Sequence, residues 1–124
     1  MTLNSIKFLL KLKNSAFKLK ISCVCLASVQ KIQLCKLLYK KGLIQQFIVQ
    51  NNFLIVQNRF VNNSSPLINL KIISRPSRTI ILSNKIIHRL KVSSSVFFFL
   101  TLKGFFTLNE CKFLNCGGIL LFIC

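Results

Sequence analysis

The chain has 124 residues, with 18 Lys and Arg against one acidic residue, Glu110, and a formal net charge of +17. Repulsion on this scale opposes a compact fold unless a polyanion neutralises it, and the obvious polyanions are nucleic acid and an anionic membrane surface. An enzyme is disfavoured, because acid–base catalysis usually needs a positioned His or paired carboxylates and the chain offers only His88 and Glu110.

The first part of the chain predicts helices and strands in the order αβαββ. The expected elements are a helix at 4–14, a strand at 20–25, a helix from a Ser28 cap to Lys41, and strands at 44–50 and 53–57. Ile6, Leu9 and Leu10 place apolar side chains on one face of the first helix. Ser28 can accept a backbone hydrogen bond at the start of the second helix, and Gly42 suits the left-handed residue that follows a helix.

Asn51-Asn52 predicts a tight turn between the two strands, because Asn tolerates left-handed backbone. The polar loop 62–66 then marks the expected boundary between an N-terminal lobe, 1–66, and a C-terminal lobe, 67–124. The fold class is therefore α+β, with two small lobes.

The C-terminal lobe is predicted to be mostly β with short helices. Its expected elements are a strand at 68–72, a basic turn at 74–78, a strand at 79–82, one or two helical turns at 84–91, a strand at 96–102, a helix at 107–114 and a strand at 119–124. Thr107 and Glu110 have the spacing of a capping box at the start of the last helix.

The apolar runs are too short or too polar to cross a membrane. The longest run without charge, 42–58, contains several Gln and Asn, whereas a spanning helix needs about 20 mostly apolar residues. A peripheral membrane protein, anchored by the basic amphipathic N-terminal helix, remains the alternative to a nucleic-acid-binding protein.

The six cysteines do not have the spacing of a zinc site. They are Cys23, Cys25, Cys35, Cys111, Cys116 and Cys124. Paired CxxC knuckles are absent from this pattern, and nothing resembles a secretory signal, so small buried side chains in a reducing compartment are favoured over a metal or cluster site. We expect no cofactor, no metal and no small-molecule substrate.

Several local strings occur in an order and spacing that resemble one family. The strings are Lys11-Leu12-Lys13-Asn14, Gly42-Leu43-Ile44, Ser74-Arg75-Pro76-Ser77-Arg78, Leu100-Thr101-Leu102-Lys103-Gly104, Thr107-Leu108-Asn109-Glu110 and Gly117-Gly118. Together they resemble ribosomal protein eight of the small subunit, in its bacterial and organellar form. The resemblance covers about 100 residues by ordered motifs.

The resemblance implies a structural protein without catalytic activity, which binds the central domain of small-subunit rRNA and contacts neighbouring small-subunit ribosomal proteins. The family's first helix begins near Asn4, which leaves no room for a removable import sequence. The chain is rich in Phe, Ile, Leu, Lys and Asn, the residues of AT-rich codons. An organelle-encoded protein of the mitochondrial ribosome is therefore expected, since departures from plastid-like patterns favour the mitochondrion.

The residues expected to bind RNA are basic, polar or glycine positions within or beside these motifs. They are Lys11, Lys13, Asn14, Lys31, Lys36, Ser74, Arg75, Arg78, Thr101, Lys103, Gly104, Gly117 and Gly118. The lysines can neutralise phosphates, and the alternative for them is a solvated helix face. The alternatives for the others are a surface turn, an ordinary strand threonine and glycines that only supply turn conformations.

The chain departs from the family in its loop of hydroxyl side chains. The family's Ser-Thr-Ser contacts unpaired bases of the rRNA, whereas this chain has Leu100-Thr101-Leu102, and Ile119 replaces a glutamate after Gly-Gly. Leucine cannot hydrogen-bond a base edge, although it can pack against a base face. Compared with the family, the chain therefore keeps the positive charge that binds phosphate but lacks some of the polar groups that contact bases.

Overall fold

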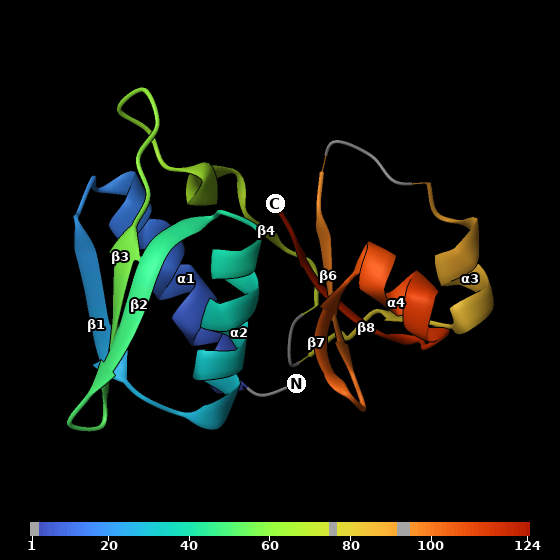
Figure 1. The fold of residues 1–124 in the computed structure, drawn as a ribbon. Coiled ribbons are helices and arrows are strands. Elements are labelled where there is room, and N and C mark those ends of the chain that lie inside the picture. Colours follow the sequence, from blue (N-terminus) through green and yellow to red (C-terminus); the bar gives the residue numbers. More distant parts are fainter. Residues whose placement is uncertain (1–2, 75–76, 92–94) are drawn as a thin grey trace. The chain divides into compact units, whose positions relative to one another are not determined.

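The computed structural model describes residues 3–74, 77–91 and 95–124. The chain divides into two compact units, Asn4–Leu70 and Lys71–Cys124, which we call the N-terminal and C-terminal units. Both units combine helices with antiparallel strands (Figure 1). The predicted α+β class is therefore confirmed.

The N-terminal unit has the predicted αβαββ order. Its elements are α1 (Leu3–Phe17), β1 (Ser22–Leu26), α2 (Val29–Lys40), β2 (Ile44–Gln50) and β3 (Phe53–Asn58). In this unit the described strands form one antiparallel sheet in the order β1-β3-β2, and α1 and α2 lie beside it (Figure 1). The core of this unit lies between the helices and the sheet. It includes Leu9 of α1, Leu34 of α2 and Leu54 of β3, which are all fully buried.

Local turn and cap chemistry sets the boundaries of these elements. Asn51 and Asn52 have φ values of 50° and 64°, so the predicted Asn-Asn hairpin is confirmed. The Ser28 hydroxyl accepts a hydrogen bond from the Lys31 backbone N–H at 3.3 Å, and Gly42 follows α2 with φ 73°. Both residues therefore act as the sequence predicts.

The buried face of α1 differs from the predicted one. Ile6 and Leu9 are buried as expected, but Leu10 is 45% exposed, and the face continues through Leu12 and Ala16. These buried positions are spaced by three or four residues, so they form one stripe on a helix that runs three residues further than predicted.

A 3-10 turn replaces most of the strand predicted at 68–72. The turn spans Pro66–Asn69, and the strand that follows, β4, is only Lys71–Ile72. The Ser65 hydroxyl accepts from the Leu67 N–H at 3.3 Å, and Pro66 fixes φ at the first position of the turn. These two local effects outweigh the alternating pattern that favoured a strand.

The C-terminal unit is built around its last strand. Its elements are β4, β5 (Ile81–Leu82), α3 (Asn84–Arg89), β6 (Phe97–Thr101), β7 (Gly104–Thr107), α4 (Leu108–Leu114) and β8 (Gly118–Ile123). Among the described strands, β8 pairs antiparallel with β4, β5 and β6, and β6 also pairs with β7. The sheet therefore depends on residues far apart in the sequence.

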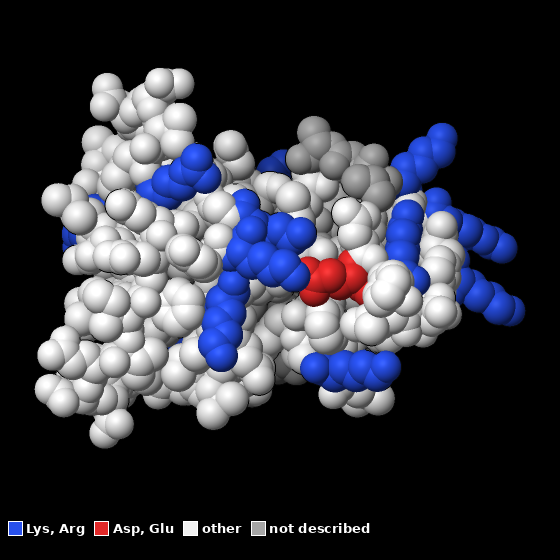
Figure 2. Space-filling model, viewed as in Figure 1, with Lys and Arg blue, Asp and Glu red and all other residues white. Residues whose placement is uncertain are grey.

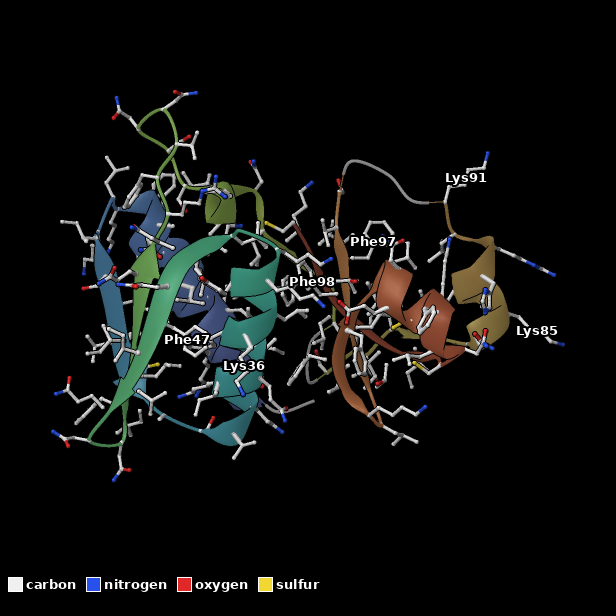
Figure 3. All side chains as sticks on the ribbon, viewed as in Figure 1. Lys36, Phe47, Lys85, Lys91, Phe97 and Phe98 are labelled. Carbon is white, nitrogen blue, oxygen red and sulfur yellow. The ribbon has the colours of Figure 1, made fainter. Side chains whose placement is uncertain are left out.

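Side chains pack on both faces of β6. Phe99 is fully buried with Ile87 of α3 and with Leu108 and Cys111 of α4. Successive strand residues point to opposite faces, so the adjacent Phe98 (Figure 3) lies on the other face of β6. There it stacks on Phe122, with ring centroids 4.4 Å apart. The run of phenylalanines in this strand is therefore partly core.

The sequence analysis missed β7, and the predicted N-cap residue of α4, Thr107, lacks the side-chain hydrogen bond of a capping box. Thr107 is both the last residue of β7 and the residue before α4, and its side chain makes no hydrogen bond to the helix. The Thr107 Oγ1 atom is buried without a partner. Thr107 is therefore the N-cap residue as predicted, but its side chain is buried and does not cap the helix.

Within residues 3–74, 77–91 and 95–124, no helix combines the length and the apolar character needed to cross a membrane.

Candidate nucleic-acid interface

A groove of about 520 Å³ lies between α1 and β1 in the N-terminal unit. Lys7, Lys11 and Asn14 reach it from α1, and Lys18 and Lys20 reach it from the segment between α1 and β1. Positions separated by three or four residues share a helix face, so residues 7, 11 and 14 form one polar stripe of α1. Lys18 follows directly after the helix, and its N–H donates to the Asn14 carbonyl at 3.0 Å. None of the described residues that line the groove is acidic, so the groove favours an anion.

Hydrogen bonds fix both walls of this groove. Lys11 Nζ donates to the Val24 carbonyl at 2.6 Å and so joins α1 to β1. At the other end, buried Asn58 donates through Nδ2 to the Lys20 carbonyl at 2.8 Å and to the Ser15 hydroxyl at 2.7 Å. The groove is therefore formed before any ligand binds, which lowers the entropic cost of binding.

Two of the predicted RNA-binding lysines hold the edge of the sheet. β1 is an edge strand, and the Val24 and Leu26 carbonyls receive hydrogen bonds from Lys11 and from Lys31, the latter at 3.0 Å. Lys31 Nζ also lies 5.9 Å from the centroid of the Phe8 ring. Both ammonium groups therefore stabilise the fold as well as adding positive charge.

The other predicted residues of the N-terminal unit have different surroundings. Asn14 is exposed in the groove, whereas Lys13 is half-buried and does not line it. Lys36 is exposed on α2 and projects away from that helix (Figure 3). The structure therefore brings Lys11 and Asn14 together, and it places Lys36 elsewhere on the unit.

In the C-terminal unit, Ser74 is used inside the fold. Its side chain is fully buried, its hydroxyl donates to the Leu120 carbonyl, and it accepts from the Ile80 N–H at 3.1 Å. Arg78 is exposed nearby in the sequence, and Arg75 lies outside the described residues. The exposed guanidinium of Arg78 remains a predicted phosphate contact.

The β6–β7 hairpin turns the hydroxyl of Thr101 inward. Thr101 Oγ1 donates to the Gly104 carbonyl at 3.0 Å and accepts from the Lys103 N–H at 3.2 Å, while Gly104 has φ 125°. Leu102 at the tip is fully exposed, and Lys103 is exposed beside it. The tip therefore presents an apolar side chain and a cation to solvent.

Gly117 and Gly118 allow close approaches of backbone. A Cβ atom at Gly117 would lie 2.8 Å from the Leu82 carbonyl oxygen, and one at Gly118 would lie 2.5 Å from the Leu100 carbonyl oxygen. Both distances are shorter than Cβ atoms tolerate. The two glycines therefore have a packing role in joining β8 to its neighbours.

Sequence reasoning did not single out several of the exposed cations. Lys7, Lys18 and Lys20 line the groove, and helical spacing from Lys11 would have identified the first two. Lys85 of α3 and Lys91 just after it are exposed and project outward (Figure 3). On the face drawn in Figure 2, blue Lys and Arg side chains greatly outnumber the single acidic group.

The six cysteines are free thiols in this structure. Cys23, Cys35 and Cys111 are buried, and burial raises the pKa of Cys35 and of Cys111 to about 12. Among the described residues, no cluster of three or more His, Cys, Asp or Glu is placed to hold a metal ion. The buried thiols therefore behave as small apolar side chains.

The family model described as "Ribosomal protein S8" matches residues 6–124. No curated protein sequence matches the chain with significance.

Proposed function

Because the chain belongs to the ribosomal protein S8 family, whose members are small-subunit ribosomal proteins that bind rRNA and are not enzymes, we propose that it is a structural constituent of the mitochondrial small ribosomal subunit. In that role it binds the central domain of the small-subunit rRNA and supports assembly and translation. Neighbouring small-subunit proteins are its further partners.

The observation that carries this proposal is the α1–β1 groove. Lys7, Lys11, Lys18 and Lys20 line it, and the described lining contains no acidic residue. Each ammonium that neutralises a phosphate releases counterions, so such a groove binds an RNA backbone with strong salt dependence. Asn14 adds donor and acceptor atoms that can contact a sugar or a base edge.

The C-terminal unit also carries exposed cations that can bind phosphate. Arg78 and Lys103 are exposed and can contact phosphates, and Leu102 can pack on the face of an unpaired base. The internal hydrogen bonds of Thr101 mean that its hydroxyl positions the hairpin tip. Recognition at this tip therefore depends on shape and charge more than on hydroxyl contacts.

Residue usage supports an organelle gene, and departures from plastid-like patterns favour the mitochondrion over the plastid. The chain has 12 Phe, two Pro and no Trp, and it is rich in Ile, Leu, Lys and Asn. AT-rich codons specify these abundant residues, and small organelle genomes commonly have that bias. A mitochondrial gene encoding the protein would account for the composition.

The test is binding of the purified chain to a transcript of the central domain, with transcripts of the other small-subunit rRNA domains as competitors. The central domain should bind tightest, and affinity should fall steeply between about 50 and about 200 mM salt. Equal affinity for every domain would contradict the specific part of the proposal. An affinity that does not change with salt would contradict a phosphate-binding groove.

A further inference from the structure

A second pocket, of about 610 Å³, lies at the C-terminal end of α2 in the N-terminal unit. Its lining includes Tyr39, Gln45, Arg59 and Phe60, and it shares no described residue with the α1–β1 groove. The motif reasoning gave no role to any of these four residues. Aromatic, amide and cationic side chains therefore meet at a place to which no function has been assigned.

A glycine contacts one of the two cations that line this pocket, Arg59; the other is Lys40. Arg59 Nη1 donates to the Gly42 carbonyl at 2.7 Å. A Cβ atom at Gly42 would lie 2.9 Å from the same nitrogen, and the φ of 73° at Gly42 disfavours any other residue. The guanidinium has five N–H donors, so one internal bond fixes its position and leaves donors for an anion.

The aromatic wall is also positioned. The Tyr39 ring packs edge to face on Phe47 of β2, with ring centroids 6.4 Å apart and planes at 75°, yet Tyr39 stays 55% exposed. Phe60 lies half-buried after β3 and contributes a second ring to the lining. Gln45 is exposed and offers both a donor and an acceptor.

We propose that this pocket binds one unpaired nucleotide of RNA. The base stacks on Tyr39, the phosphate pairs with the Arg59 guanidinium, and the Gln45 amide hydrogen-bonds the base edge. Unpaired bases are typically held by stacking on aromatic side chains beside cations that contact the backbone. The pocket volume lies within the range of small-molecule sites. This inference rests on the proposed function, because it assumes that the chain's polyanion is RNA.

The chain contains one tyrosine and no tryptophan, which gives a direct probe. In protein with carbon-labelled tyrosine rings, every ring signal in the NMR spectrum comes from Tyr39. Titration with a short single-stranded oligouridylate should move these signals upfield, as a stacked base does. The same RNA annealed into a duplex should leave them in place, because its bases are already stacked on one another.

Matched variants distinguish RNA binding in this pocket from nonspecific attraction of RNA to the positive charge of the protein. Arg59→Gln should weaken oligouridylate binding and remove the upfield shift, whereas Arg89→Gln, which replaces an exposed Arg of α3, should keep the shift. Tyr39→Leu should weaken binding by about 5- to 150-fold, the range measured for loss of one stacking contact. Phe113→Leu, at an aromatic side chain 85% exposed on α4, is its control and should bind as the unaltered chain does.

The possible failures of this inference and of the proposed function give different results. If the oligouridylate and the central-domain transcript both bind in a salt-dependent way while the Tyr39 signals stay unchanged, the nucleotide pocket is overturned and the proposed function stands. If neither RNA binds to folded protein, as checked by circular dichroism, both proposals are overturned.

Discussion

Removing Lys7 and Lys18 from the groove should make RNA binding less sensitive to salt. Both side chains are exposed and line the groove, Lys7 on α1 and Lys18 in the turn directly after that helix. Lys11 is kept, because its bond to the Val24 carbonyl holds the sheet edge and its loss would confuse folding with binding. The double variant Lys7→Gln, Lys18→Gln therefore isolates the electrostatic contribution.

The magnitude follows from counterion release. Each phosphate contact contributes about 0.7 to the slope of log affinity against log salt for single strands, and about 0.9 for a duplex. Loss of two contacts should flatten the slope by about 1.4 to 1.8. Raising the salt from about 50 to about 200 mM should then narrow the affinity gap between the original chain and the variant by about 7- to 12-fold.

The assay is filter binding or fluorescence anisotropy with the central-domain transcript at several salt concentrations. Lys7→Arg, Lys18→Arg keeps both charges and should retain the original slope, which makes it the matched control. Circular dichroism confirms that the variants fold. Parallel slopes for the Gln variant and the original chain would refute the reasoning, because they would show that neither lysine contacts phosphate.

Three predictions concern the fold beneath these surfaces. Ser74→Ala should lower the free energy of unfolding by about 1–3 kcal/mol in a urea titration, because the partly buried Ile80 N–H loses its acceptor, whereas Ser77→Ala at an exposed turn should change it little. Gly118→Ala should cost about 1–3 kcal/mol through overpacking against the Leu100 carbonyl, and an unchanged urea midpoint would contradict that contact. The raised pKa of Cys35, about 12 against 9.0, means that the folded state keeps its proton between these pH values while the unfolded state loses it. The stability that the protonated Cys35 contributes is fully present below pH 9. Above pH 9, the difference in free energy of unfolding between the original chain and Cys35→Ala should shrink by about 1.4 kcal/mol per pH unit. This difference should level off near pH 12, where the folded state also loses the proton.

Local chemistry explains the parts of the fold that the sequence predicts well. The Ser28 cap, the left-handed Gly42 and the Asn51-Asn52 turn each depend on residues within a few positions of one another. The strand expected at 68–72 failed for a local reason as well, since the Ser65 cap and Pro66 favour a 3-10 turn. In that case two local signals competed, and hydrophobic alternation was the weaker one.

Contacts between distant residues account for the rest. β7 is four residues long and exists through pairing with β6, so its own sequence carries little signal. The motifs identified Lys11 and Asn14, but Lys20 joins them only through the turn that Asn58 holds. The second pocket likewise needs the β2–β3 hairpin to bring Arg59 to the Gly42 carbonyl.

The central claim, that the chain is a mitochondrial small-subunit ribosomal protein, is tested most directly by sedimentation. A mitochondrial lysate is separated on a sucrose gradient and the protein is located by mass spectrometry, with and without RNase. The account predicts a peak that coincides with small-subunit rRNA and collapses after RNase treatment. A peak in the membrane fraction that RNase leaves unchanged would contradict it and would favour a peripheral membrane protein.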